Sequence, residues 1–259
     1  MKARTVAALL MLTFAGAALA AAKPAGPFAN LKFRNLGPAV SGGRVSATIG
    51  VPGKPGVYYV GTAGAGLWKT TDDGIKWDNV FKHGDAASIG AVALAPSDPK
   101  KIWLGTGEAN PRNDILLGRG VYFSPDDGKT WQFKGLADAG LISNIVVNPT
   151  DPGTVYVAVL GNPWKPSETR GVFMTTYGGK KWKKVLYVND TTGASDIETD
   201  PSNPKVLLAG MGTEQCKPWT QVNGSTDGGI FKSTDGGRTW NKIGGGLPTR
   251  IFYMSQGGY

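Results

Sequence analysis

Short apolar runs, separated by turn-forming residues, recur along this chain. A typical pair is SATIGV (residues 46–51) and VYYVGT (residues 57–62), with the turn PGKP between them. Runs of this length bounded by Gly, Pro, Asn and Asp are typical of β-strands. The same arrangement surrounds three more proline turns, PSDP at Pro96, PTDP at Pro149 and PSNP at Pro201. The pattern therefore predicts four β-hairpins.

A second turn follows each hairpin and has the form Ser/Thr-x-Asp-x-Gly-x-x-Trp, called here the aspartate motif. Its copies are TTDDGIKW from Thr70, SPDDGKTW from Ser124, TTYGGKKW from Thr175 and STDGGRTW from Ser233. One apolar run ends at each motif and another begins at its Trp, so each unit has four strands, a to d. Four-stranded units repeated in this way are the sequence form of β-propeller blades. We therefore predict an all-β chain with four propeller blades.

The repeat also sets the expected boundaries. The predicted blades are residues 44–83, 87–136, 140–188 and 193–243. Phe33 has the spacing of a last-strand aromatic without strands a to c before it, so residues 31–38 are interpreted as an orphan closing strand. Residues 248–259 do not fit the repeat and are interpreted as an irregular or truncated tail. The propeller region, 31–247, is therefore expected to be part of a larger ring, in which it would pack against missing C-terminal blades of the same protein. A complete four-bladed ring is the alternative.

A structural role suits the aspartate motif better than a catalytic one, because an active site rarely needs several copies of one residue. A short Asp side chain can accept N–H groups of its own turn, Gly supplies a positive φ, and Trp can pack between neighbouring blades. The third copy has Tyr177 in place of Asp, which we expect to weaken one turn. The residues assigned this role are Asp72, Gly74, Trp77, Asp126, Gly128, Trp131, Gly179, Trp182, Asp235, Gly237 and Trp240.

Most of the length variation lies between strands b and c. Because strands alternate in direction, these b–c loops and the blade-to-blade links share one face, opposite the aspartate motifs. Loops on a rigid scaffold commonly carry binding groups. The b–c face is therefore the expected functional face, and its long loops are residues 108–120, 161–171 and 212–229.

Two kinds of candidate residue lie in these loops. Weak catalytic candidates are Glu108, Asp114, Glu168 and Glu214, because glycoside hydrolysis uses two carboxyl groups that flank the sugar bond. The alternative is that Glu108 and Asp114 pair with Arg112 or Arg119, and Glu168 with Arg170. Trp164 and Trp219 are expected either to stack on a sugar or anchor a peptide, or to plug the loops. The ligand-binding candidates are Arg112, Arg119, Trp164, Lys165, Arg170, Lys217 and Trp219.

The amino-acid composition limits the metal sites and the partners that the chain can have. The chain has one histidine, His83, and one cysteine, Cys216, which excludes a zinc site built from several His and Cys ligands. We expect no metal and no cofactor. The net charge of +9 would favour acidic partners, but the cations are scattered and KKWKK (residues 180–184) alternates like an exposed strand edge. A solvated surface is therefore favoured, and no nucleic-acid partner is expected.

The first twenty residues have the order of a secretory signal peptide. Lys2 and Arg4 precede an apolar run that ends in Ala18-Leu19-Ala20, a small-x-small cleavage site. A transmembrane anchor is the alternative, but the run is short and weakly apolar for a membrane span. We expect residues 1–20 to be removed, residues 21–30 to form a linker, and the mature protein to be exported without a transmembrane anchor.

Residues 28–247 resemble large exported bacterial proteins with BNR (Asp-box) repeats, a family described as sortilin-like or as glycosyl hydrolases. The resemblance rests on stretches such as FRNLGPAVSGGRV, YVGTAGAGLWKTTDDGIKW and VLYVNDTTGASDIETDPSNP. It implies a propeller fold. Such repeats also occur in sialidases, xyloglucanases, sortilin receptors and a photosystem II assembly factor, some of which are not enzymes.

Two enzymatic relatives can be compared residue by residue. Xyloglucanases carry a catalytic Asp in a Thr-Asp-x-Gly-Gly context, and Ala63 stands at the similar position here. Sialidases carry Phe-Arg-Ile-Pro, of which only Phe33 and Arg34 remain. These departures favour a binding or scaffold module that recognises a protein, peptide or glycan through its b–c face. The alternative is a fragment of a glycoside hydrolase that acts on polysaccharide.

Overall fold

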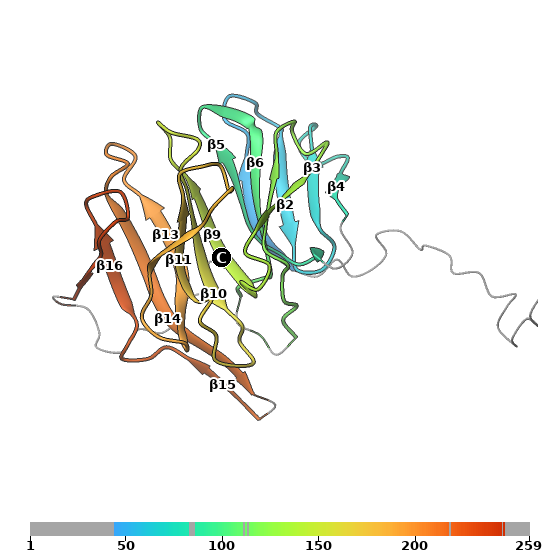
Figure 1. Cartoon of the computed structure of the whole chain (residues 1–259). Coiled ribbons are helices and arrows are strands. Elements are labelled where there is room, and N and C mark those ends of the chain that lie inside the picture. Colours follow the sequence, from blue (N-terminus) through green and yellow to red (C-terminus); the bar gives the residue numbers. More distant parts are fainter. Residues whose placement is uncertain are drawn as a thin grey trace, which may run out of the picture. The chain divides into compact units, whose positions relative to one another are not determined.

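The computed structural model describes residues 44–82, 86–110, 112, 114–217, 219–244 and 246. They fall within one compact unit of the chain, Pro38–Tyr259. The regular elements among them are β-strands, arranged as four antiparallel sheets (Figure 1). The all-β prediction with four-stranded blades is confirmed. The predicted signal peptide (1–20), linker (21–30), orphan strand (31–38) and tail (248–259) lie outside the described residues.

The first three sheets each contain four consecutive strands paired in chain order. Blade 1 has β1 (Val45–Gly50), β2 (Tyr58–Thr62), β3 (Leu67–Thr70) and β4 (Asp78–Phe81). Blade 2 has β5 (Ile89–Ala95), β6 (Asp98–Thr106), β7 (Val121–Ser124) and β8 (Gln132–Gly135). Blade 3 has β9 (Leu141–Val147), β10 (Val155–Gly161), β11 (Gly171–Thr175) and β12 (Lys183–Leu186).

The fourth sheet contains an additional hairpin. Its main strands are β13 (Thr192–Thr199), β14 (Leu207–Lys217), β16 (Gly229–Ser233) and β17 (Asn241–Ile243), and β15 (Thr220–Asn223) pairs with the end of β14. Figure 1 shows β14 running on past the sheet into this hairpin. The segment 212–229 was expected to be a loop. Part of this segment instead forms a hairpin, in which the end of β14 pairs with β15. In the end of β14, the buried Glu214 and Cys216 alternate with the half-buried Gln215 and Lys217, so one side of the hairpin is buried.

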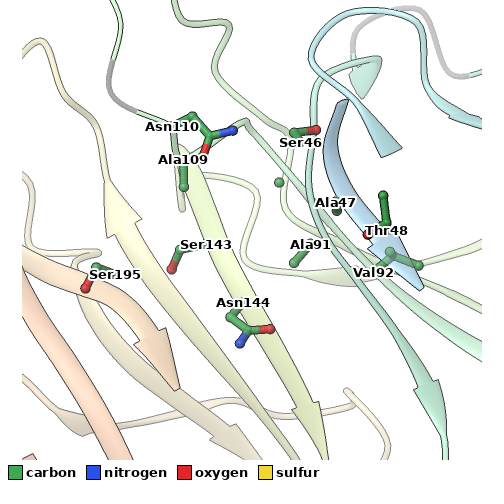
Figure 2. Close-up of a pocket in the computed structure, with 11 residues that line it drawn as sticks. Ser46, Ala47, Thr48, Ala91, Val92, Ala109, Asn110, Ser143, Asn144 and Ser195 are labelled. Atoms are coloured by element: carbon green, nitrogen blue, oxygen red, sulfur yellow. The ribbon is translucent and has the colours of Figure 1, made fainter. Parts of the chain in front are cut away.

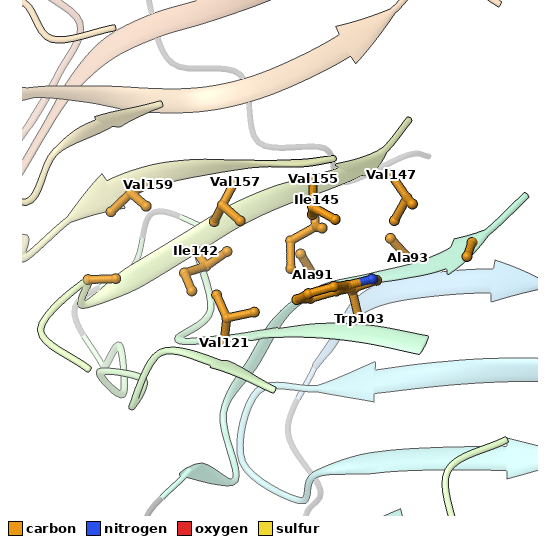
Figure 3. Close-up of a cluster of buried hydrophobic side chains, with 12 residues drawn as sticks. Ala91, Ala93, Trp103, Val121, Ile142, Ile145, Val147, Val155, Val157 and Val159 are labelled. Atoms are coloured by element: carbon orange, nitrogen blue, oxygen red, sulfur yellow. The ribbon is translucent and has the colours of Figure 1, made fainter. Parts of the chain in front are cut away.

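Neighbouring sheets are held together by apolar side chains from alternate strand positions. Between blades 2 and 3, Trp103 is 2% exposed and lies in a cluster of small and branched residues. Figure 3 shows its ring near Ala91 and Ala93, with Ile145 and Val155 across the sheet boundary. The alanines leave room for the indole, so the two faces fit at the close packing that protein interiors require.

Serine hydroxyls join the first strands of adjacent blades. Ser46 Oγ lies 3.1 Å from the Gly61 carbonyl oxygen in its own blade and 2.6 Å from the Ile89 carbonyl oxygen in the next. Ser143 makes the equivalent two contacts between blades 3 and 4. Both serines sit in irregularities of their strand pairing. These contacts hold the first strands side by side and thereby place the b–c loops of successive blades next to one another.

Candidate functional site

The aspartate motif uses its carboxylate inside its own turn. In blade 2, Asp126 Oδ1 accepts hydrogen bonds from the Thr130 backbone N–H at 2.8 Å and from Ser124 Oγ at 2.9 Å. The backbone hydrogen bond from Thr130 is the main cause that holds the pKa of Asp126 below its usual value. Asp72 and Asp235 make the same kinds of hydrogen bond. In this geometry the carboxylates stabilise turns.

The third motif keeps part of this network without a carboxylate. Thr175 Oγ1 accepts the backbone N–H groups of Tyr177 at 3.1 Å and Gly179 at 3.2 Å. The Tyr177 side chain is 66% exposed. The hydroxyl thus keeps the turn closed while the bonds that Asp supplies in the other blades are missing.

The motif tryptophans divide into two pairs. Trp131 Nε1 donates to the Val80 carbonyl of the preceding blade at 2.8 Å, and Trp182 makes the equivalent bond across the next boundary at 2.7 Å. Trp77 and Trp240 instead donate to carbonyl groups of their own turns, at 2.9 and 3.1 Å. Trp240 still packs against the apolar cluster shared by blades 3 and 4, whereas Trp77 is 37% exposed.

On the b–c face, Glu108 is buried and ion-paired with Arg44, which also donates to it from Nε at 2.7 Å. The hydrogen bonds that Arg44 donates to the Glu108 carboxylate raise the pKa of Arg44. Asp114 is exposed and accepts from Arg112 Nε at 3.2 Å, which lowers its pKa. Arg112 was an expected partner of Asp114. Arg44 was missed, because it precedes Glu108 by 64 residues.

Blade 3 differs from the expected pairing. Arg170 does not pair with Glu168 but is buried, and its guanidinium donates to the carbonyl oxygens of Leu160 and Asn162 at 2.5 Å. Burial lowers its pKa to about 10. Glu168 is exposed, and its backbone carbonyl accepts from Lys184 Nζ. The expected Glu168–Arg170 pair is therefore wrong, since carbonyl groups of the loop occupy the guanidinium. In this position Arg170 holds the b–c loop in place.

Glu214 is also enclosed by protein groups. Gln221 Nε2 donates to its carboxylate at 3.0 Å across the β14–β15 hairpin, and Cys216 Sγ lies 3.6 Å away. Burial raises the pKa of Glu214 and also raises the pKa of the Cys216 thiol, to about 11. Of the four carboxylate candidates, Glu108 and Glu214 are thus withdrawn from solvent, while Asp114 and Glu168 remain exposed.

Both candidate tryptophans of the b–c loops reach solvent. Trp164 is 39% exposed, and its backbone N–H is fixed by Asn162 Oδ1 at 2.9 Å. Trp219 is 80% exposed at the tip of the β14–β15 hairpin, next to the half-buried Lys217. Trp219 therefore does not plug its loop against the sheets, whereas Trp164 is exposed only in part.

A pocket of about 230 Å³ lies between the b–c loops of blades 2 and 3. Arg119 enters it from the first loop, and Asn162, Lys165 and Thr169 from the second. The two sides are tied together, because Thr169 Oγ1 donates to the Asp138 carbonyl oxygen of the blade-to-blade link at 3.0 Å. Arg119 and Lys165 are exposed, and neither is ion-paired within the described residues. The pocket therefore offers free cationic and polar donors, with Trp164 adjacent to Lys165 in the chain.

A second hollow follows the first strands of the four sheets. Figure 2 shows it lined by small polar side chains, among them Ser46, Ser143, Asn144 and Ser195. Its volume is about 100 Å³, which suits a few water molecules better than an organic ligand. Within the part of the chain that the structure describes, no three His, Cys, Asp or Glu side chains are grouped as a metal site would need.

The family assignment rests on a match that covers more than half of the chain. The family model Sortilin-Vps10 (sortilin, neurotensin receptor 3) matches residues 119–256. This chain belongs to the Sortilin-Vps10 family. No helix among the described residues of this Sortilin-Vps10 protein has the length and hydropathy to cross a bilayer.

The family member is also similar to enzymes. It is 26% identical over 226 residues to xyloglucanase Xgh74A of Acetivibrio thermocellus, covering 76% of this chain and 25% of the relative. It is 27% identical over 285 residues to a xyloglucanase of Paenibacillus sp., covering 91% and 26%. The chain thus spans about a quarter of the length of these curated relatives. An ancestral GH74 enzyme superposes with a TM-score of 0.61 at 22% identity, over 79% of this chain and 26% of that one, a likeness in fold.

Proposed function

We propose that this Sortilin-Vps10 chain is part of an exported β-propeller that binds a protein, peptide or glycan through its b–c face, without catalysis. The observation that carries the proposal is the pocket between blades 2 and 3. Loops from two blades form its walls, and Arg119 and Lys165 line it without ion-pair partners in the described residues. Ligand pockets commonly combine a preformed hollow with a few converging polar groups.

A glycan is the ligand to test first. Trp164 leaves part of its indole in solvent beside the pocket loop, and a flat aromatic surface with hydroxyl, amide and cationic donors nearby suits a sugar ring. The curated relatives are named xyloglucanases, so xyloglucan oligosaccharides are the natural first probe.

The second candidate is a fragment of a glycoside hydrolase. The likeness to the xyloglucanases over most of this chain favours it. Hydrolysis needs two carboxyl groups that reach the sugar bond, about 5–5.5 Å apart for retention or about 6.5–9.5 Å for inversion. Glu108 and Glu214 are buried, so Asp114 and Glu168 remain, and a further carboxylate would come from other blades of a longer protein.

Binding is tested by titrating the full chain with xyloglucan oligosaccharides and following the heat of binding. We expect Trp164→Ala to weaken binding about tenfold, in line with the loss of an aromatic contact at a binding centre. Trp77→Ala is the matched control, because Trp77 has a similar exposure and belongs to an aspartate motif on the opposite face. Equal affinity of the wild-type chain and Trp164→Ala would contradict the proposed site.

An activity assay with the same oligosaccharides distinguishes the binding module from the glycoside hydrolase. Release of new reducing ends that stops in Asp114→Asn or in Glu168→Gln would favour the hydrolase. Binding without release, lost in Trp164→Ala, would favour the binding module. Export is tested by sequencing the N-terminus of the mature protein, which we expect to begin after Ala20.

A further inference from the structure

The boundary between blades 1 and 2 is closed by a charged contact on the aspartate-motif face. Asp127, the fourth residue of its motif, accepts hydrogen bonds from the Tyr59 hydroxyl and from Lys69 Nζ, both of the preceding blade. Burial opposes the ionised form of Asp127, but the hydrogen bonds from Lys69 and Tyr59 outweigh it and hold its pKa below the usual value. A carboxylate therefore completes this boundary.

Strand register identifies the equivalent residues between blades 3 and 4. Tyr156 pairs with Met174 as Tyr59 pairs with Lys69, and Gly236 is the fourth residue of the aspartate motif. The lysine and the carboxylate are thus both replaced, while the tyrosine remains. The backbone is unchanged in this region. The N–H groups of Asp127 and Gly236 donate at 2.8 Å to the carbonyl oxygens of Lys100 and Lys205, the residues that directly follow the proline turns of their own blades.

A groove of about 420 Å³ lies where these side chains are replaced. Tyr156 donates to the Gly236 carbonyl oxygen at 3.0 Å, and a Cβ added to Gly236 would lie 3.8 Å from the Tyr156 hydroxyl, which is an ordinary van der Waals contact without a clash. Lys205 and Arg238 line the groove, and neither is ion-paired within the described residues.

Asp235 is the acidic residue that lines this groove, and its carboxylate is hydrogen-bonded within its own turn. Asp235 accepts from the backbone N–H and hydroxyl of Thr239 and from Ser233 Oγ. The hydrogen bonds from Thr239 are the main cause that lowers the pKa of Asp235. The Asp235 carboxylate is therefore held within its own turn. Among the residues that the structure describes, no carboxylate is ion-paired with Lys205 or Arg238 as Asp127 is with Lys69.

We propose that the groove between blades 3 and 4 binds a small carboxylate-bearing ligand, whose acid group takes the place that the Asp127 side chain fills between blades 1 and 2. Lys205 and Arg238 supply the positive charge, and the groove has the size of a site for a small molecule or one acidic side chain. Both cations are exposed, so the attraction is weakened by salt. The site uses none of the residues of the b–c face and is independent of the function proposed above.

The test is a nuclear magnetic resonance titration of the full chain with two acids, N-acetylglutamate methylamide and glucuronate. Their neutral counterparts are N-acetylglutamine methylamide and glucose. We expect both acids to shift the backbone amide signals of Gly236 and Arg238 with a saturable dependence, and the neutral compounds to leave them in place. Tighter binding of the blocked glutamate would identify a peptide as the source of the carboxylate, and tighter binding of glucuronate would identify an acidic glycan. Equal shifts with acid and neutral compound would overturn the proposal.

Gly236→Asp is the decisive variant, because it supplies the carboxylate from within the chain. The backbone accepts it, since Gly236 has φ of 75° and Asp127 holds 67° at the equivalent position. We expect binding of the acids to fall at least tenfold. Gly178→Asp is the matched control, because it adds the same charge at the same motif position of blade 3, at φ of 60° and with open space around it. Undiminished binding by Gly236→Asp, or an equal loss in Gly178→Asp, would overturn the proposal.

A charge variant tests the cation separately. Arg238→Gln should weaken acid binding about threefold, the scale of one exposed ion pair. Lys180→Gln removes the cation at the same motif position of blade 3 and should leave binding unchanged. Equal effects of the two substitutions would show that only net charge matters and would contradict a defined site. Thermal unfolding of each variant verifies that it is folded.

Discussion

At the boundary between blades 1 and 2, the paired positions of strands b and c carry Tyr59 and Lys69, which meet the Asp127 carboxylate. At the next boundary the same register positions carry Trp103 and Phe123, whose ring centroids are 4.9 Å apart. Trp182 completes this second boundary in an edge-on contact with Trp103. The backbone is thus repeated while the side chains change together. In this charged boundary the loss of the carboxylate leaves the Lys69 ammonium group without its counter-charge.

The aromatic boundary should be the more costly one to disrupt. Trp103→Ala removes a side chain that is 2% exposed and leaves a cavity among Ala91, Ile142 and Val157, so we expect a loss of about 3–5 kcal/mol of unfolding free energy. Urea denaturation of the full chain measures it. Trp219→Ala is the control and should change stability by less than about 0.5 kcal/mol, because its indole lies on the surface. A loss at Trp103 no larger than that at Trp219 would contradict the packing described here.

The charged boundary should respond less strongly. Asp127→Asn keeps the side-chain shape and tolerates the positive φ, but it leaves Lys69 without its counter-charge, so we expect a loss of about 1–3 kcal/mol. Asp73→Asn is the control: it makes the same change at the same motif position of blade 1, at φ of 58°, and Asp73 is in no ion pair within the described residues. Equal losses would show that the contact across the boundary contributes nothing.

The pH dependence of stability tests the same contact of Asp127 with Lys69. The pKa of Asp127 is lower in the folded chain than its usual value, so its contribution is present above the unfolded pKa of about 3.9. It is lost as the pH falls through the folded value, where the native carboxylate takes up a proton. The stability difference between wild type and Asp127→Asn should therefore shrink between pH 5 and lower pH, as measured by urea unfolding at each pH. A difference that stays constant down to acid unfolding would contradict the ionised pair.

The smallest effect concerns the third aspartate motif. Tyr177→Asp restores the carboxylate that Asp126 and Asp235 use to accept backbone N–H groups, and little is lost because the tyrosine side chain is largely exposed. We expect a gain of about 0.5–1.5 kcal/mol, the usual net contribution of a hydrogen bond. Tyr177→Ala removes the ring without adding an acceptor and should show no gain. A gain of equal size in both variants would place the effect in the ring rather than in the turn.

The candidate site was only partly predictable. The loop positions of Trp164 and Lys165 and the pairing of Asp114 with Arg112 could be read from neighbouring residues. The partners of Glu108 and Arg170 could not, because Arg44 is distant in the chain and Arg170 turns inward to carbonyl groups. The packing of two loops decides which partner a side chain between them contacts, and the sequence around that side chain does not determine this packing.

The sequence by itself determined the four sheets and their turns. Strand alternation, proline turns and the aspartate motif are local patterns, and each acts over a few residues through backbone geometry and hydrogen bonding. Only the tertiary structure decided which boundaries are charged, aromatic or open. It also decided that Glu108 and Glu214 are buried and that residues 220–223 form a strand. These outcomes depend on side chains brought together from different blades, where burial and charge are set by the neighbours across the boundary.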